Sequence, residues 1–154
     1  MTSPGIPFPP PTLYLVLGCV FYGLDKVVSV SIPISLPPHI RILVIILSLV
    51  VLSLVVLYTE WMFKTHNTSI LPWTSDSRLI TTGPFAYSRN PVYLVSILLS
   101  VAMAAYLESA WVLLSGLVTM WIIDRMIIPK EERYLEQEFG EAYLRYKKKV
   151  RRWI

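Results

Sequence analysis

Charged residues, cysteine and histidine are all scarce in this chain. Only 16% of its 154 residues are charged and 55% are hydrophobic, which excludes an ordinary soluble domain and indicates an integral membrane protein. Cys19 is the only cysteine, so an intrachain disulfide and a cysteine-based metal cluster are excluded. The two histidines, His39 and His66, are too few and too far apart to predict a metal site.

Two further signals are missing from the polar parts of the sequence. The opening stretch MTSPGIPFPPP has no basic region, so no cleavable signal peptide is expected, and its prolines predict a short extended arm. No interleaving of aromatic and basic residues suggests a nucleic-acid-binding face. The net charge of +4 is therefore interpreted as a mark of membrane orientation, not of nucleic-acid affinity.

Four apolar segments predict membrane-spanning helices, since a span needs ~20 predominantly apolar residues. They are residues 12–32, 42–59, 92–107 and 109–123. The first is the least pure, because Asp25 and Lys26 interrupt it. The last two are separated by Glu108 alone and predict a tight helical hairpin with short or tilted arms.

The expected fold is therefore all-α, an integral membrane protein with about four transmembrane helices in a single domain over residues 1–154. Residues 1–63 would hold the N-terminal arm and two spans, and residues 64–154 a polar loop, the hairpin and a C-terminal amphipathic helix. A helix lying on the membrane surface is predicted from a basic segment with an apolar stripe. The stripe consists of Leu135, Phe139, Tyr143, Tyr146, Val150 and Trp153.

Lysine and arginine are concentrated in two of the segments outside the expected spans. Lys64, Arg78 and Arg89 lie between the second and third spans, and most of the others follow the fourth. The positive-inside rule places both segments on the cytoplasmic side. Four spans then put both termini on that side too, and the two polar segments can form one site there.

The first polar segment contains two turn signals, Gly83-Pro84 and Asn90-Pro91. Proline is well suited to the first turn of the third span, because its missing N–H costs nothing there. Arg89 would then stand beside the unpaired N–H groups of the helix start, which favours a carboxylate or phosphate ligand. The alternative is that Arg89 only anchors this helix at the lipid headgroups.

The second polar segment contains adjacent carboxylates. Pro129 can open a helix with Glu131 and Glu132 in its first turn. Both lie close to Asp124 and Arg125 at the end of the fourth span. The amphipathic pattern of the tail accounts for its lysines and its apolar stripe, but not for this pair.

These motifs, taken in order, resemble a known superfamily over residues 66–152. The matching residues are Thr82-Gly83-Pro84-Phe85, Ser88-Arg89-Asn90-Pro91-Val92-Tyr93, Glu131-Glu132, Leu135, Phe139-Gly140, Tyr143 and Tyr146. The pattern is similar to that of the isoprenylcysteine carboxyl methyltransferase and phospholipid methyltransferase superfamily: a Gly-x-Tyr turn, Arg-His-Pro-x-Tyr-x-Gly, a hairpin, Glu-Glu and Phe-Gly-x-x-Tyr-x-x-Tyr. The resemblance implies an integral membrane methyltransferase that binds S-adenosyl-L-methionine at the cytoplasmic end of the hairpin. Consistently, the chain has no Gly-x-Gly-x-x-Gly dinucleotide motif.

The resemblance also implies roles for individual residues. Arg89 would pair with the cofactor's carboxylate, the two glutamates with its ammonium or ribose hydroxyls, and the tyrosines with its adenine and sulfonium. The implied catalytic residues are Arg125 and Glu132, and no metal is expected. The implied cofactor-binding residues are Gly83, Pro84, Arg89, Asn90, Pro91, Tyr93, Leu94, Glu131, Glu132, Tyr143 and Tyr146. A lipophilic or small-molecule methyl acceptor would come from the bilayer.

Two positions depart from the superfamily pattern. Asn90 replaces its histidine, so any role needing an imidazole is excluded, and Val95 replaces its glycine and would crowd a cofactor lying against the third span. The first sixty residues carry no motif of the superfamily, so the acceptor and the type of methylation stay open, as does the oligomeric state. An NADPH-dependent membrane reductase of the sterol reductase type, which carries a similar Arg-His-Pro turn, and a non-catalytic membrane relative remain as alternatives.

Overall fold

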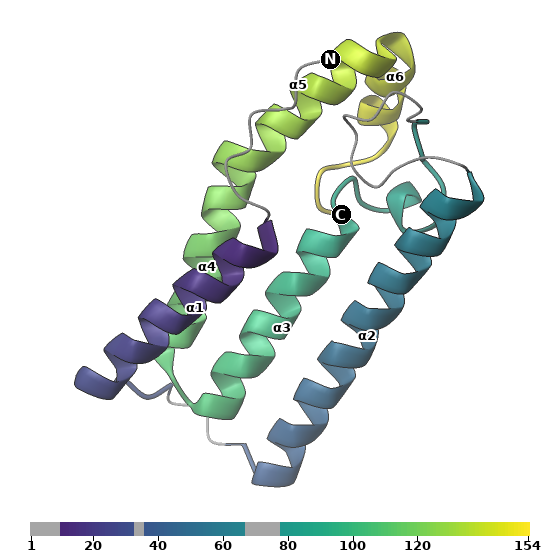
Figure 1. Ribbon diagram of the computed structural model, residues 1–154. Coiled ribbons are helices and arrows are strands. Elements are labelled where there is room, and N and C mark those ends of the chain that lie inside the picture. The colour runs from purple at the N-terminus through teal and green to yellow at the C-terminus, as the bar shows by residue number, and fades with distance from the viewer. Residues whose placement is uncertain (1–9, 33–35, 67–77) are drawn as a thin grey trace.

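The protein is all-α, as the sequence predicts, in a computed structural model that describes residues 10–32, 36–66 and 78–154. Figure 1 shows the long helices lying side by side. They are α1 (Pro10–Val27), α2 (Pro38–Thr65), α3 (Pro91–Leu107) and α4 (Ala110–Ile122). Helix α2 packs against α3, α3 against α4, and α4 against α1.

The last of these helices continues without a break into the polar part of the chain. A π-helical turn, η2 (Ile123–Ile127), joins α4 to α5 (Ile128–Phe139). Pro129 lies in the first turn of α5 together with Glu131, as expected, although α5 follows directly on α4 through the π-helical turn. Its ring would clash with the carbonyl of Arg125 in a regular α-helix, and the wider π-helical turn lies at that point.

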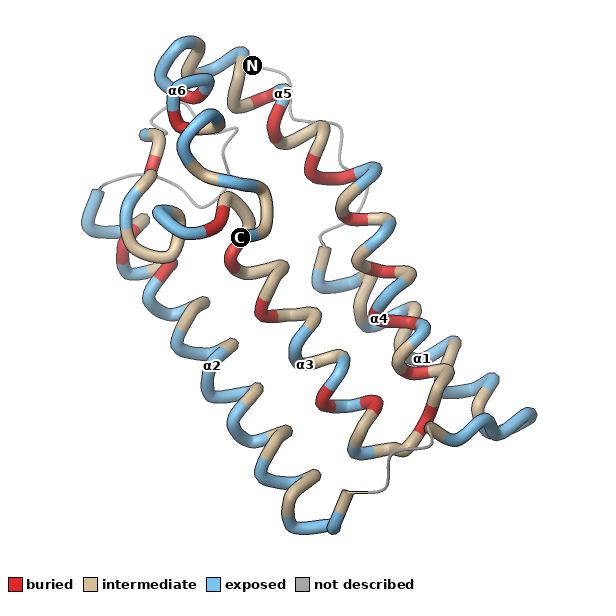
Figure 2. The backbone as a smooth tube through the Cα atoms, turned by 180° about the vertical axis from the view of Figure 1, so that it is seen from behind, coloured by how far each residue is buried: buried red, intermediate tan, exposed pale blue. Residues whose placement is uncertain are grey.

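Among the described residues, two helices are long and apolar enough to cross a membrane, Pro38–Thr65 and Ala110–Phe139, and α3 is a shorter apolar helix. Within α2 only Thr59 and Met62 are buried. Figure 2 shows the rest of this helix exposed or half-buried, whereas the buried positions gather on α3, α4 and α5. So much exposed apolar surface is exceptional in a water-soluble monomer and fits a lipid environment.

The hairpin expected around Glu108 is present, and its turn ties the helices together at one end. Glu108 ends α3 in the left-handed conformation, with a φ of 52°, and the Ser109 hydroxyl accepts the N–H of Val112 to cap α4. The same two residues reach the other helices: Glu108 pairs with Arg41 at 2.7 Å, and the Ser109 hydroxyl donates to Asp25 at 2.7 Å. Asp25 of α1, which interrupts the first apolar segment, thus accepts a hydrogen bond from this turn.

The two arms of the hairpin approach closely at Gly116. A Cβ atom built there would lie 2.7 Å from Ser100 Cβ on α3. Gly116→Ala is therefore expected to lower the free energy of unfolding by about 1–3 kcal/mol, because the helices must move apart. Thermal unfolding in detergent, followed by circular dichroism, measures the loss.

Gly18→Ala is the matched control for Gly116→Ala. Gly18 is also inside a helix, but a Cβ there meets nothing within 4 Å, so alanine should leave stability unchanged or raise it by roughly 0.5–1 kcal/mol. Equal melting temperatures for the two variants would show that Gly116 is not a close contact.

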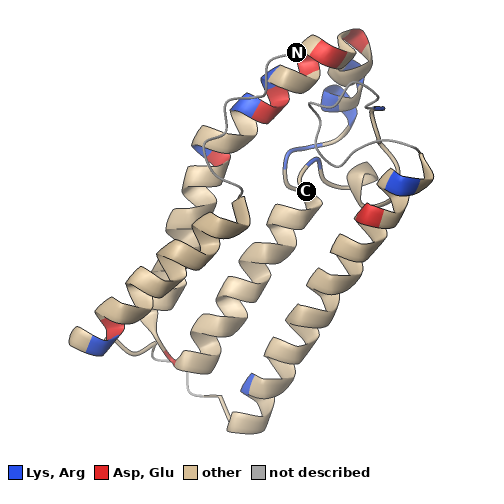
Figure 3. Cartoon of the chain, viewed as in Figure 1, with Lys and Arg blue, Asp and Glu red and all other residues tan. Residues whose placement is uncertain are grey.

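Charged residues gather at the end of the bundle opposite the hairpin turn (Figure 3). The gathering includes the residues around η1 (Gly83–Ala86), α5, α6 (Glu141–Lys149) and the C-terminal residues that follow α6. The expectation that the two polar segments meet at one end is confirmed.

The amphipathic tail forms two helices, and not the single helix expected. Gly140, with a φ of +50°, separates α5 from α6. Tyr143 is only 1% exposed and Tyr146 is also buried, and Trp153 packs against the isoleucines of η2 and α5. A stripe with helical spacing predicts an apolar face but not what covers it, and here much of that face is covered by the protein itself.

Candidate functional site

The Gly83-Pro84 turn lies between α2 and α6. Gly83 has a φ of +60°, and a Cβ atom there would lie 2.8 Å from Tyr58 of α2. On the other side, the Tyr146 hydroxyl donates to the carbonyl of Phe85 at 2.7 Å. Glycine is needed at this position for both its backbone conformation and its close packing.

The segment that follows is hydrogen-bonded to the C-terminal residues. The Arg89 N–H donates to the carbonyl of Arg151 at 3.1 Å. The carbonyl of Arg152 accepts from the Ser88 hydroxyl at 3.1 Å and from the Asn90 side-chain amide at 3.4 Å. Asn90, which replaces the superfamily histidine, therefore holds the C-terminal segment against the start of α3.

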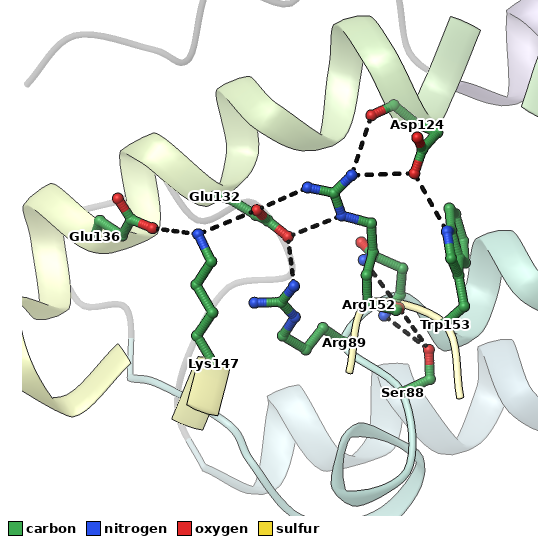
Figure 4. A network of polar contacts seen from close by, with 9 residues as sticks. Ser88, Arg89, Asp124, Glu132, Glu136, Lys147, Arg152 and Trp153 are labelled. Carbon is green, nitrogen blue, oxygen red and sulfur yellow. Dashed lines mark hydrogen bonds and ion pairs between the residues drawn. The ribbon is translucent and has the colours of Figure 1, made fainter. Parts of the chain in front are cut away.

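Glu132 lies at the centre of the site, in contact with three cations (Figure 4). Its Oε1 is 3.0 Å from Arg89 Nη2 and accepts from Arg152 Nε at 3.2 Å. Its Oε2 is 3.0 Å from Arg152 Nη2 and 3.4 Å from Lys147 Nζ. The side chains of Arg89 and Glu132 are only 9% and 8% exposed, so their pair is shielded from water.

Further acidic groups complete the cluster. Lys147 also pairs with Glu136 at 2.7 Å, and Arg152 Nη1 with Asp124 Oδ1 at 3.1 Å. Trp153 Nε1 donates to the same Asp124 oxygen at 3.2 Å. We call this set the Glu132 network, and its charged members are Arg89, Asp124, Glu132, Glu136, Lys147 and Arg152. These side chains offer both positive and negative partners to a ligand that carries both charges.

The surroundings keep Glu132 ionised at neutral pH. It lies beyond the uncharged part of its helix, which ends at Ile123. Burial alone would raise the pKa of Glu132, but the hydrogen bond from Arg152 and the charges of Arg89, Arg152 and Lys147 hold that pKa below its usual value. The hydrogen bond to Glu132 raises the pKa of Arg152 in turn. Burial raises the pKa of Tyr146 to about 12, so its hydroxyl stays protonated.

Arg89 has hydrogen-bonding capacity that the described residues do not use. Its Nε and Nη1 atoms are buried and have no hydrogen-bond partner within the described part of the chain. A buried donor left unsatisfied costs about 1–3 kcal/mol. Each of these nitrogens can donate a hydrogen bond to a ligand oxygen, such as that of a carboxylate.

The two adjacent glutamates do not share one environment. Glu131 does not contact the cations of the Glu132 network and instead accepts a hydrogen bond from the Tyr93 hydroxyl at 2.9 Å. Neighbouring residues on a helix point about 100° apart, since one turn takes ~3.6 residues. Glu131 and Tyr93 thus lie on one side of the helix, and Glu132 with Arg89 on another.

The other residues implied by the resemblance are placed as follows. Arg125 is 70% exposed and pairs with Asp124 at 3.6 Å, so it is not brought to Glu132. Pro91 is buried and begins α3, and the Leu94 N–H donates to the carbonyl of Asn90 within that first turn. Tyr143 and Tyr146 pack edge to face with ring centres 6.0 Å apart.

Sequence reasoning missed three charged members of the network. Glu136, Lys147 and Arg152 lie in a tail whose charges fit equally well to a helix on a membrane surface. The run KKKVRR gave no sign that Lys147 and Arg152 turn toward Glu132. Arg152 lies three residues after the end of α6, where the chain has left the helix.

Comparisons with known proteins match the part of the chain that contains the hairpin and Glu132. A family model described as phospholipid methyltransferase matches residues 40–142, which include both arms of the hairpin, Arg89 and Glu132. A protein of Haemophilus influenzae, described as uncharacterized, is 38% identical over 63 residues, which is 41% of this chain and the whole of that relative. The region matched by the family model ends before Lys147 and Arg152.

Proposed function

Because the chain belongs to the phospholipid methyltransferase family, we propose that it is an integral membrane methyltransferase that uses S-adenosyl-L-methionine. Its acceptor would be a lipophilic or small molecule that reaches the site from the bilayer. Proteins of this kind, like the isoprenylcysteine carboxyl methyltransferases that the motifs resemble, bind the cofactor without a dinucleotide-binding domain.

One observation carries the proposal: Arg89 is buried beside Glu132 and has two nitrogens without partners among the described residues. S-adenosyl-L-methionine presents an amino-acid group with a carboxylate and an ammonium. Arg89 would hold the carboxylate, and Glu132 the ammonium, in exchange for part of its present pairing with Lys147 or Arg152. The Glu132 network thus contains both a cation for the carboxylate and a carboxylate for the ammonium of this group.

Other parts of the site would position the cofactor and exclude water. Gly83, Pro84 and Asn90 shape the backbone around Arg89, and Tyr143 and Tyr146 close the side formed by α6. When bound, the cofactor supplies a methyl group on a positively charged sulfur. A dry site strengthens the electrostatic interactions of its buried charges and holds the reacting groups close together, which favours transfer without a covalent enzyme intermediate.

The decisive experiment is calorimetric titration of the detergent-purified protein with three ligands. S-adenosyl-L-methionine and S-adenosylhomocysteine are expected to bind, and NADPH is not. Binding of NADPH alone would identify a membrane reductase. Absence of binding by all three would identify a non-catalytic relative.

We further propose that all four apolar segments cross the membrane, with the Glu132 network and both termini on the cytoplasmic side. The prediction is tested after replacing Cys19, by labelling single cysteines with a membrane-impermeant maleimide. Tyr87→Cys, at a residue 80% exposed beside the network, should be labelled only from the cytoplasmic side. His39→Cys, at the exposed start of α2, should be labelled only from the opposite side. Labelling of both from one side would refute this orientation.

A further inference from the structure

A second polar group lies beside the Glu132 network, where the ends of α1, α3 and α5 meet. It consists of Glu131, Tyr93 and Tyr14, and we call it the Glu131 group. Tyr93 donates to Glu131 Oε1, and both Tyr14 and Tyr93 pack against the buried cluster of Ile123, Ile127 and Ile128. The Glu132 network uses none of its three side chains.

The Tyr14 hydroxyl is the unexplained member of this group. It is buried and has no hydrogen-bond partner in the part of the chain that the structure describes. It is close enough to the Tyr93 hydroxyl to interact with it electrostatically. A buried hydroxyl without a partner costs about 1–3 kcal/mol, so its position beside Tyr93 and Glu131 points to a polar ligand group between α1 and α3.

We infer that Glu131 accepts the proton of the methyl acceptor, and that the Tyr14 hydroxyl binds the polar end of that acceptor. This inference rests on the proposed methyl transfer. In this step the acceptor's lone pair forms the new bond to the methyl carbon, and the electron pair of the carbon–sulfur bond stays with sulfur. The acceptor's proton moves to the Glu131 carboxylate. Glu131 then loses that proton to water before the next turnover.

The electrostatic surroundings of Glu131 suit this role. Burial raises the pKa of Glu131, the Tyr93 hydrogen bond lowers it, and the charge of Glu132 raises it again, with a net increase. The titratable groups that act on it are Tyr93 from α3 and Glu132 from its own helix, and Tyr14 from α1 lies beyond Tyr93. A general base is most efficient when its pKa lies near the working pH, so a carboxylate with a raised pKa is better suited than a solvated one.

The geometry also restricts the acceptor. An amine, thiol or hydroxyl brings a proton that Glu131 can accept, whereas a carboxylate acceptor brings none and would be repelled by the ionised glutamate. Leu15 and Val16, next to Tyr14 on α1, are 67% and 57% exposed. The Glu131 group therefore lies next to the apolar surface at which a lipophilic acceptor would arrive.

Infrared titration of the protein in lipid vesicles tests the proton-holding role without any ligand. A protonated-carboxyl band that titrates above the usual range of glutamate should be present in wild type, lost in Glu131→Gln and kept in Glu138→Gln, a control at an exposed glutamate of the same helix. Tyr93→Phe should move this titration to still higher pH, because it removes a hydrogen bond that favours the ionised form. An identical band in wild type and Glu131→Gln would overturn the inference.

Binding and turnover separate this role from cofactor binding. With labelled S-adenosyl-L-methionine, and with vesicles containing phosphatidylethanolamine or dodecanethiol as amine and thiol probes, Glu131→Gln should lower kcat ~100-fold or more and leave the cofactor Kd unchanged. Tyr14→Phe should raise the KM for the acceptor probe without changing the cofactor Kd. A wild-type kcat in Glu131→Gln, or loss of its cofactor binding, would overturn the inference. Absence of cofactor binding by the wild type would instead refute the proposed function itself.

Discussion

Glu132→Gln is expected to lower the free energy of unfolding by about 3–5 kcal/mol, because it breaks a buried ion pair by removing one partner. The substitution keeps the size of the side chain but leaves Arg89, Lys147 and Arg152 without the carboxylate that they share. Their mutual repulsion is then opposed only by Asp124 and Glu136. Thermal or denaturant unfolding in detergent measures the loss, and Glu138→Gln is the matched control.

The same variant should change how stability depends on pH. The folded-state pKa of Glu132 lies below its usual value, so its ionised form stabilises the fold above the unfolded-state pKa. That contribution is lost as the pH falls through the folded-state pKa. Glu132→Gln should therefore lose less stability than the wild type on acidification. Parallel curves would mean that Glu132 is not held ionised by its neighbours.

Arg89→Lys is expected to weaken cofactor binding by roughly tenfold to a hundredfold, the equivalent of ~1.5–3 kcal/mol for a hydrogen bond to a charged group. Lysine keeps the positive charge beside Glu132 but lacks the two guanidinium nitrogens that have no partner in the described residues. The fold should be affected much less than by Glu132→Gln, because the central carboxylate keeps its three cations. Calorimetric titration with S-adenosyl-L-methionine measures the affinity.

Arg145→Lys is the control for Arg89→Lys, since Arg145 lies exposed on α6. It should bind the cofactor as the wild type does. If Arg89→Lys also kept the wild-type affinity, the buried arginine would serve only to pair with Glu132. The ligand carboxylate would then have to be sought elsewhere.

The sequence by itself determined the helical class and the position of its main elements. A helix satisfies its own backbone hydrogen bonds, so an uncharged apolar run must form one in lipid wherever it lies in the fold. The run 92–107 matches α3 closely, and Pro91 begins that helix as expected. Two expected spans, the third and the fourth, separate Arg89 from Glu132, so the sequence also predicted that both residues lie at the same end of the bundle. The structure confirms this prediction.

Only the tertiary structure decided which side chains meet at that end. The sequence motif treats Glu131 and Glu132 as a pair, yet the rotation between successive helical residues directs one to Tyr93 and the other to Arg89. Arg152 joins the site because the chain leaves α6 at Val150 and returns to Ser88 and Asn90, more than sixty residues earlier. Such contacts depend on how separate segments pack, and spacing along the chain specifies only the contacts within one segment. For the same physical reason, the apolar stripe of the tail predicted an apolar face, but only the folded chain showed that Tyr143 and Tyr146 of that face are buried against the protein.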